Sequence, residues 1–152
     1  MEQELKFENP IETVLNGYYK NASVGVDSIT CLLNSVQDEN FRKELFQQLD
    51  YYEHQKHALT AQMASFYQLP KDSGKMAKFY TRMTIRMKKY KYHNHMSVHE
   101  CAKLMAEGTN MGMIQLHQVI NHNPEIPDTI RQQGKQILSH EREYLDRITP
   151  YL

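Results

Sequence analysis

The sequence predicts an all-α protein in which residues 1–152 form one four-helix bundle. Apolar residues recur three and four positions apart through four long segments, which is the spacing of one helix face. Alternating strand patterns bounded by turn dipeptides are missing. With 6 Gly and 5 Pro among 152 residues, the chain also has few helix breakers.

Proline and capping residues set the expected limits of each helix. Pro10 suits a first helical turn, Asp38 is a good N-cap, and Pro70 ends the second apolar stripe. Pro127 closes the last turn before the final helix. The short joint before Asp38 makes the first two helices an antiparallel hairpin. We therefore expect helices at about 10–36, 39–68, 97–121 and 127–149.

The stretch between the two hairpins is strongly basic. Residues 71–91 hold eight Lys or Arg and one Asp, a net charge of +7 that the rest of the neutral chain balances with −7. Met and Tyr line one side of this stretch, so we expect an extra basic amphipathic crossover helix within 70–95. Binding to nucleic acid or to an anionic membrane surface is the alternative. We favour docking onto the acidic remainder, within the molecule or in a dimer.

The two halves of the chain resemble each other. A pattern of small and apolar residues in the first helix recurs in the third at an offset of 87, and one in the second helix recurs in the fourth at an offset of 88. Two similar helical hairpins therefore pack face to face. The matched pairs are Ala22 with Thr109, Gly25 with Gly112, Ile29 with Leu116, Leu32 with Val119, Leu33 with Ile120, Leu49 with Ile137, Glu53 with Glu141, and Lys56 with Tyr144.

A duplicated hairpin with a long crossover resembles the ferritin-like fold, over roughly residues 10–150. That family's di-iron site takes Glu from two helices and Glu-x-x-His from the other two. This chain has Glu53-x-x-Lys56 and Glu141-x-x-Tyr144 instead, and no Glu-x-x-His. It also resembles small uncharacterised or spore-coat-associated ferritin-like bundles of spore-forming bacteria. The resemblance implies a bacterial bundle with a degenerate di-iron site.

A buried polar layer is the expected replacement for the metal. A buried carboxylate must be paired, must bind a cation, or must stay protonated. We expect the Lys56 ammonium to take the charge role of the metal and to neutralise Glu141 and Glu53, with Tyr144 as a hydrogen-bond donor. Such a layer also fixes the helix register.

This layer predicts a non-catalytic role without a cofactor, as a structural or protein-interaction protein. The alternative is a divergent iron- or manganese-binding or oxidase-type protein that uses Glu53, His57 and Glu141. A third possibility is a small-molecule site, which would form a polar cavity in the middle of the bundle. The residues beside that cavity would be Ala22, Gly25, Thr109 and Gly112.

A histidine cluster opens the third helix. His95 and His99 are four residues apart and share a helix face, as a surface zinc or nickel site requires. His93 and Glu100 lie beside them. An exposed polar helix start explains the same residues, and we favour it.

The two cysteines are expected to be structural, and the protein is expected to be cytoplasmic. Cys31 and Cys101 form no CxxC motif and lie on apolar stripes, so buried reduced thiols are expected. The two would share one end of the bundle if the crossover runs lengthwise. No leader or membrane span is evident. We expect a homodimer or another homo-oligomer in the cytoplasm, with spore association allowed by the resemblance.

Overall fold

The computed structural model describes residues 9–71 and 96–152. It contains no strand in these two ranges, so the all-α prediction is confirmed for them. The helices begin within one residue of the predicted positions and end up to three residues earlier. They are α1 (Pro10–Leu33), α2 (Glu39–Ser65), α4 (Val98–Asn121), α5 (Asp128–Ile148) and the short 3-10 helix η1 (Thr149–Tyr151).

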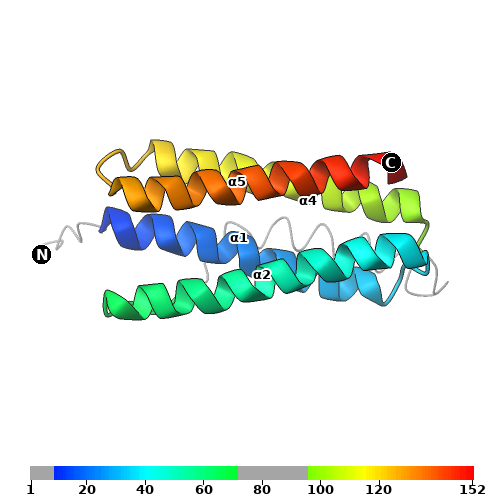
Figure 1. Cartoon of the computed structure of the whole chain (residues 1–152), viewed down its shortest axis with the longest axis horizontal. Coiled ribbons are helices and arrows are strands. Elements are labelled where there is room, and N and C mark those ends of the chain that lie inside the picture. The colour runs from blue at the N-terminus through cyan, green and yellow to red at the C-terminus, as the bar shows by residue number, and fades with distance from the viewer. Residues whose placement is uncertain (1–8, 72–95) are drawn as a thin grey trace, which may run out of the picture.

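Figure 1 shows two helical hairpins side by side, with α2 running back along α1 and α5 running back along α4. Long-range hydrogen bonds fix their relative directions. The Tyr18 hydroxyl donates to the carbonyl of Ile130 at the start of α5, over 2.8 Å. The N–H of Met96, just before α4, donates to the carbonyl of Ser35, just after α1, over 2.8 Å. Helices α1 and α5 therefore start at one end of the bundle, and α4 starts at the other.

The first described range ends at Lys71 and the second begins at Met96, and these two residues lie at opposite ends of the bundle. The N–H of Lys71 donates to Oδ1 of Asn16 in the first half of α1, over 2.8 Å, whereas Met96 lies beside the end of α1. Beyond Lys71, the predicted basic crossover helix lies outside the described residues. Cys31 and Cys101 lie near the same end of the bundle, and both are free thiols.

Side-chain caps explain where the helices begin. The Asp38 carboxylate accepts the N–H of Phe41 over 2.8 Å, so the predicted N-cap of α2 is confirmed. Asn9 caps α1 in the same way through the N–H of Ile11, and Pro10 follows at a position that needs no donor.

The end of α2 differs from the prediction because Tyr67 stops the helix. Tyr67 has φ 57°, in the left-handed region that more often holds glycine. The N–H of Gln68 then bonds to the carbonyl of Met63, and the N–H of Tyr67 bonds to that of Ala64. These two bonds form a Schellman motif, which ends α2 three residues before the expected position.

The core consists of two apolar clusters, one toward each end of the bundle. One cluster includes Leu32, Phe41 and Ile148, and the other includes Leu15, Met63 and Ile137. Along α1 and α5 the clusters meet next to Asn21 and Glu141, which are buried polar residues. A polar layer therefore crosses the bundle at about half its length.

Candidate functional site

Glu141 lies at the centre of the bundle and both of its carboxylate oxygens are hydrogen-bonded. It projects from α5 and is 1% exposed. Nδ2 of Asn21 on α1 donates to Oε1 over 3.1 Å, and the hydroxyl of Tyr52 on α2 donates to Oε2 over 2.7 Å. The carboxyl group thus joins three helices through one layer of hydrogen bonds.

The environment of Glu141 shifts its titration toward neutral pH. Burial raises the pKa of Glu141 from 4.5 to about 7, although the hydrogen bonds from Tyr52 and Asn21 lower it in part. Both donors are uncharged side chains, so they stabilise the carboxylate less than a cation would. Glu141 therefore exchanges a proton close to physiological pH.

Two glycines make room for the two donors. A Cβ atom on Gly25 would overlap the ring of Tyr52, and a Cβ atom on Gly112 would overlap Oδ1 of Asn21. These glycines are the pair that the internal repeat matches across the two hairpins. Only glycine allows the close approach of side chain to backbone at these positions.

Three further hydroxyl groups in this region have no hydrogen-bond partner within the described residues. They belong to Ser28 on α1, Thr109 on α4 and Tyr144 on α5. All three residues are buried. A buried hydroxyl without a partner costs free energy, so each such group in a native fold needs an explanation.

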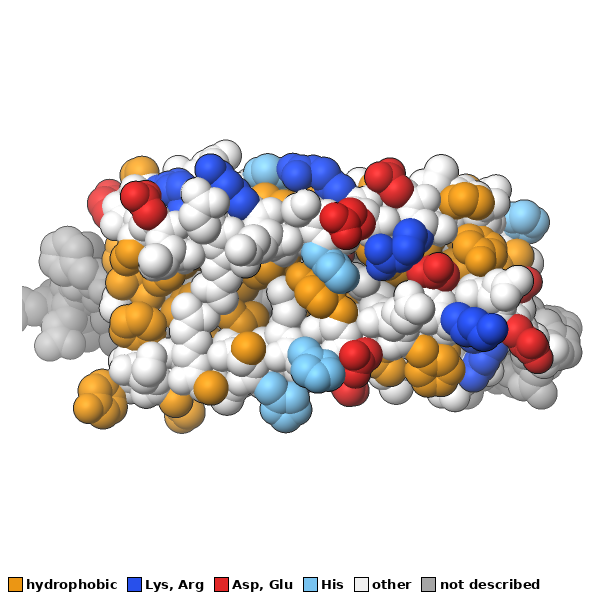
Figure 2. Space-filling view, in the orientation of Figure 1, with side chains coloured by type: hydrophobic (Ala, Val, Ile, Leu, Met, Phe, Trp, Pro, Cys, Tyr) orange, Lys and Arg blue, Asp and Glu red, His pale blue; other side chains and the backbone are white. Residues whose placement is uncertain are grey.

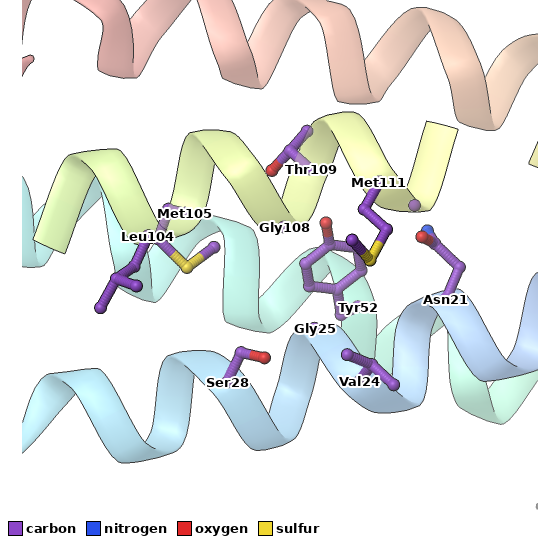
Figure 3. A pocket seen from close by; sticks show the side chains of 11 residues that line it. Asn21, Val24, Gly25, Ser28, Tyr52, Leu104, Met105, Gly108, Thr109 and Met111 are labelled. Atoms are coloured by element: carbon purple, nitrogen blue, oxygen red, sulfur yellow. The ribbon is translucent and has the colours of Figure 1, made fainter. Parts of the chain in front are cut away.

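Two of these hydroxyl-bearing residues line a pocket between α1 and α4. Figure 3 shows Ser28 below this pocket and Thr109 above it, with Tyr52 behind. The cavity has a volume of about 30 Å³, which holds about two water molecules. It is also lined by Asn21, Val24, Gly25, Leu104, Met105, Gly108, Met111 and Gly112. Three of the four residues predicted to lie beside a mid-bundle cavity, Gly25, Thr109 and Gly112, line this pocket.

A second, wider groove separates α2 from α5. Its volume is about 340 Å³, and Leu59 and Ile137 are among its lining residues. The rings of Tyr51 and His140 stack beside it with centroids 3.4 Å apart. Nε2 of His140 lies 3.1 Å from Oε1 of Gln48, and burial lowers the pKa of His140, which favours the neutral imidazole. Figure 2 shows this face, with apolar side chains visible along the line between the two helices.

The predicted membership of the polar layer is partly wrong. Glu141 and Tyr144 are buried, but Glu53 is exposed. Lys56 is half-buried, and its Nζ lies 5.7 Å from the centroid of the Tyr19 ring. The described residues contain no ion pair between Lys56 and Glu141, because Asn21 and Tyr52 are the partners of Glu141.

The predicted alternative metal ligands do not meet either. Glu53 and His57 are exposed on α2, whereas Glu141 points into the core. Across 9–71 and 96–152, no group of three or more His, Cys, Asp or Glu side chains is arranged to hold a metal ion.

The histidine cluster and the basic stretch are described only in part. Nδ1 of His99 lies 2.8 Å from the carbonyl oxygen of Tyr151, whereas His93 and His95 lie outside the described residues. Within 71–91, only Lys71 is described, and its ammonium forms an ion pair of 3.2 Å with Glu12. No helix in the described ranges has both the length and the apolar character that crossing a membrane requires.

Sequence reasoning missed Asn21 and Tyr52 as the partners of Glu141. Tyr52 belongs to the apolar stripe of α2, so its burial could be expected but its hydrogen bond could not. Asn21 directly precedes Ala22, the small residue that the repeat had singled out. The signal in the sequence was an amide side chain directly beside a position expected to face the core.

No family model, no curated protein and no solved structure matches the chain. The chemistry of the site itself therefore has to indicate the function.

Proposed function

We propose that this chain is a non-catalytic bundle of the ferritin-like type that serves as a structural or protein-interaction protein. The hydrogen bonding of Glu141 carries the proposal. One donor from α1 and one from α2 occupy its two oxygens, with N···O and O···O distances of 3.1 and 2.7 Å. In this proposal, the layer stands where ferritin-like relatives hold a di-iron site.

The layer has a physical role in such a bundle. If α5 slid or rotated against α1 and α2, Glu141 would enter an apolar cluster without donors. Leaving a buried polar group unsatisfied costs about 1–3 kcal/mol, and more for a charged group. The layer therefore favours one helix register over others, as single buried polar residues do in coiled coils.

Metal analysis tests the non-catalytic assignment. Protein purified without a His-tag should contain iron and manganese well below one ion per chain, as measured by plasma mass spectrometry. Stoichiometric iron or manganese would overturn the proposal in favour of a divergent metal-binding or oxidase-type protein. The predicted ligands for that alternative, Glu53 and His57, are exposed rather than beside Glu141, so we do not propose it.

Exposed apolar side chains at the end of α2 support the interaction role. Phe66 is 44% exposed, Leu69 is 78% exposed and Tyr67 is fully exposed. Clusters of this kind mark contact surfaces more often than single exposed residues do. We propose that the chain forms a homodimer or another homo-oligomer through this end, in the cytoplasm, where the free thiols of Cys31 and Cys101 stay reduced.

Sedimentation velocity tests this self-association. The variant Phe66→Ser with Leu69→Ser should sediment as a monomer at concentrations where the parent chain is oligomeric. Phe46→Ser is the matched control, because Phe46 is similarly exposed but lies near the other end of α2. A parent chain that is monomeric throughout, or an oligomer that survives the double substitution, would contradict this contact.

A further inference from the structure

The pocket between α1 and α4 contains several oxygen atoms that can accept hydrogen bonds. Asn21 gives a side-chain N–H to Glu141 and turns its Oδ1 toward Gly112, which also lines the pocket. Tyr52 gives its hydroxyl proton to Glu141, so its oxygen can only accept further hydrogen bonds, and the Gln48 side chain is one donor beside it. The same bonds that satisfy Glu141 therefore leave acceptor oxygens on the two donor residues.

The unpartnered hydroxyls add to this set. Ser28 is 4% exposed and Thr109 is 6% exposed, and both line the pocket without a hydrogen-bond partner in the described residues. They extend from facing helices, as Figure 3 shows. A hydroxyl oxygen accepts as well as donates, so a guest with several N–H bonds would satisfy both.

We propose that this pocket binds an ammonium ion or the ammonium group of a small primary amine. An ammonium group has three or four N–H donors and no acceptor, so it can bond to the hydroxyl oxygens of Ser28 and Thr109 within an otherwise largely apolar lining. The cavity of about 30 Å³ has room for about two water molecules, and an ammonium group is about the size of one. The external ammonium would thus take the role that Lys56 was expected to fill.

The outer part of the pocket fits a short apolar body. Val24 and Met111 are half-buried and Met105 is buried, and all three line the pocket. Methionine side chains adapt to irregular guests. A primary amine with one to three carbons would place its charged end at Ser28 and Thr109. Its carbon chain would extend out of the two-water cavity along Val24 and Met111.

Glu141 supplies the negative charge, one hydrogen bond away from the pocket through Asn21 and through Tyr52. Burial raises the pKa of Tyr51, Tyr52 and Tyr144, and raises that of Cys101 on α4 to about 12. These groups therefore stay neutral near pH 7. Asn21 is the polar-layer residue of α1, and its amide does not titrate. Besides Glu141, the charged groups Glu44 and Arg147 act on Tyr144, and these two pair with each other over 3.1 Å.

Binding should therefore be coupled to the protonation of Glu141. A cation in the pocket favours the carboxylate, and deprotonation in turn favours the cation, because linkage is reciprocal. Affinity should rise as pH increases through about 7, the pKa of Glu141. Primary amines stay protonated at pH 8, since an amine such as that of lysine has a pKa near 10.4. The scaffold role proposed above stands whether or not the pocket is filled.

Methyl NMR of the full-length protein, labelled with ¹³C at the methionine methyl groups, tests the site. Ammonium chloride and propylammonium chloride should shift the Met105 and Met111 signals saturably at pH 8, with at least tenfold weaker binding at pH 5.5. Tetramethylammonium chloride, which has no N–H donor, and neutral propan-1-ol should produce no saturable shift. Sodium chloride at equal ionic strength is the reference.

Three variants distinguish a loss of ligand binding in the pocket from a loss of folding. Ser28→Ala with Thr109→Val removes the two unpartnered hydroxyls and should weaken propylammonium binding at least tenfold while the protein stays folded. Ser139→Ala, an exposed serine on α5, is the matched control and should bind as the parent chain does. Glu141→Gln should weaken binding at pH 8 and remove its pH dependence.

Several outcomes would overturn the inference. The first is no saturable shift with either ammonium salt at pH 8. The second is equal binding of tetramethylammonium or propan-1-ol, which would indicate a plain apolar cavity. The third is a high-resolution crystal structure in which ordered water stays in the pocket at saturating ammonium. None of these results bears on the metal content or the oligomeric state that test the proposed function.

Discussion

The Tyr52 hydroxyl donates a 2.7 Å hydrogen bond to Oε2 of Glu141 and thereby ties α2 to α5 at the middle of the bundle. Toward the end of α2, a groove that Leu59 and Ile137 help to line separates the two helices. The contact is a short hydrogen bond to a buried carboxyl group, the kind that contributes most to stability when the acceptor is ionised.

Removing the Tyr52 hydroxyl should destabilise the protein. At pH 8, Tyr52→Phe leaves the Glu141 carboxylate with Asn21 alone, at a cost of roughly 2–3 kcal/mol. Tyr144→Phe is the matched control, because the Tyr144 hydroxyl is equally buried but has no hydrogen-bond partner in the described residues. Because it removes a buried hydroxyl that has no partner, this variant should be at least as stable as the parent chain. Urea unfolding of both variants measures the difference, and equal losses would contradict the assigned partner.

The titration of Glu141 should make stability depend on pH. Its pKa is about 7 in the folded protein, whereas the ordinary value, expected in the unfolded state, is 4.5. The folded state therefore binds the proton more tightly than the unfolded state does. Protonated Glu141 therefore contributes to the free energy of unfolding. This contribution is complete below about pH 4.5 and is lost as pH rises through 7. The loss is on the order of 3 kcal/mol.

Glu141→Gln isolates this contribution from the other titrating groups. The variant should match the parent chain at pH 5 and exceed it in unfolding free energy at pH 8, because its amide carries no charge at either pH. The measurement is urea unfolding at both pH values. If the parent chain and Glu141→Gln show the same change in unfolding free energy between pH 5 and pH 8, Glu141 is not the titrating group.

The sequence predicts the bundle well because its periodic apolar faces and its caps are local signals. The Asp38 cap is visible in the sequence and present in the structure. The early end of α2 at Tyr67 is not visible, since a tyrosine rarely takes a left-handed φ. Helix ends depend on such single backbone choices, whereas helix faces average over many residues.

The partners of the polar layer could not be predicted because they depend on helix rotation. The repeat matches Glu141 to Glu53 at an offset of 88, but the residue that meets Glu141 is Tyr52, 89 positions away. One residue along a helix turns the side chain by about 100°, which is enough to move Glu53 into solvent. Asn21 is 120 positions from Glu141, and no local pattern connects the two.

Lys56 provides a direct test of this correction. If the ammonium neutralised Glu141, Lys56→Met would cost several kcal/mol. With Nζ 5.7 Å from the centroid of the Tyr19 ring instead, the loss should stay within about 1 kcal/mol. Urea unfolding at pH 8 decides between the two values, and a large loss would restore the lysine to the layer.

Gly25 and Gly112 should be the glycines that tolerate substitution least among those beside the polar layer. Alanine at Gly25 would displace the Tyr52 ring, and alanine at Gly112 would displace the Asn21 amide, so each should destabilise the bundle by about 1–3 kcal/mol. Gly17→Ala is the matched control on α1. Its added Cβ would lie 3.1 Å from Cγ1 of Val119, a contact that a small shift relieves, while helix propensity gains up to about 1 kcal/mol.

The glycine variants should also shift the titration of Glu141. Displacing either donor removes a bond that lowers the Glu141 pKa, so both variants should raise this pKa further above 7, and Gly17→Ala should leave it unchanged. NMR of the Glu141 side-chain carboxyl carbon across pH 5–9 measures this directly. A destabilised Gly25→Ala or Gly112→Ala protein with an unchanged carboxyl titration would mean that the glycines serve general packing and not the two hydrogen bonds to Glu141.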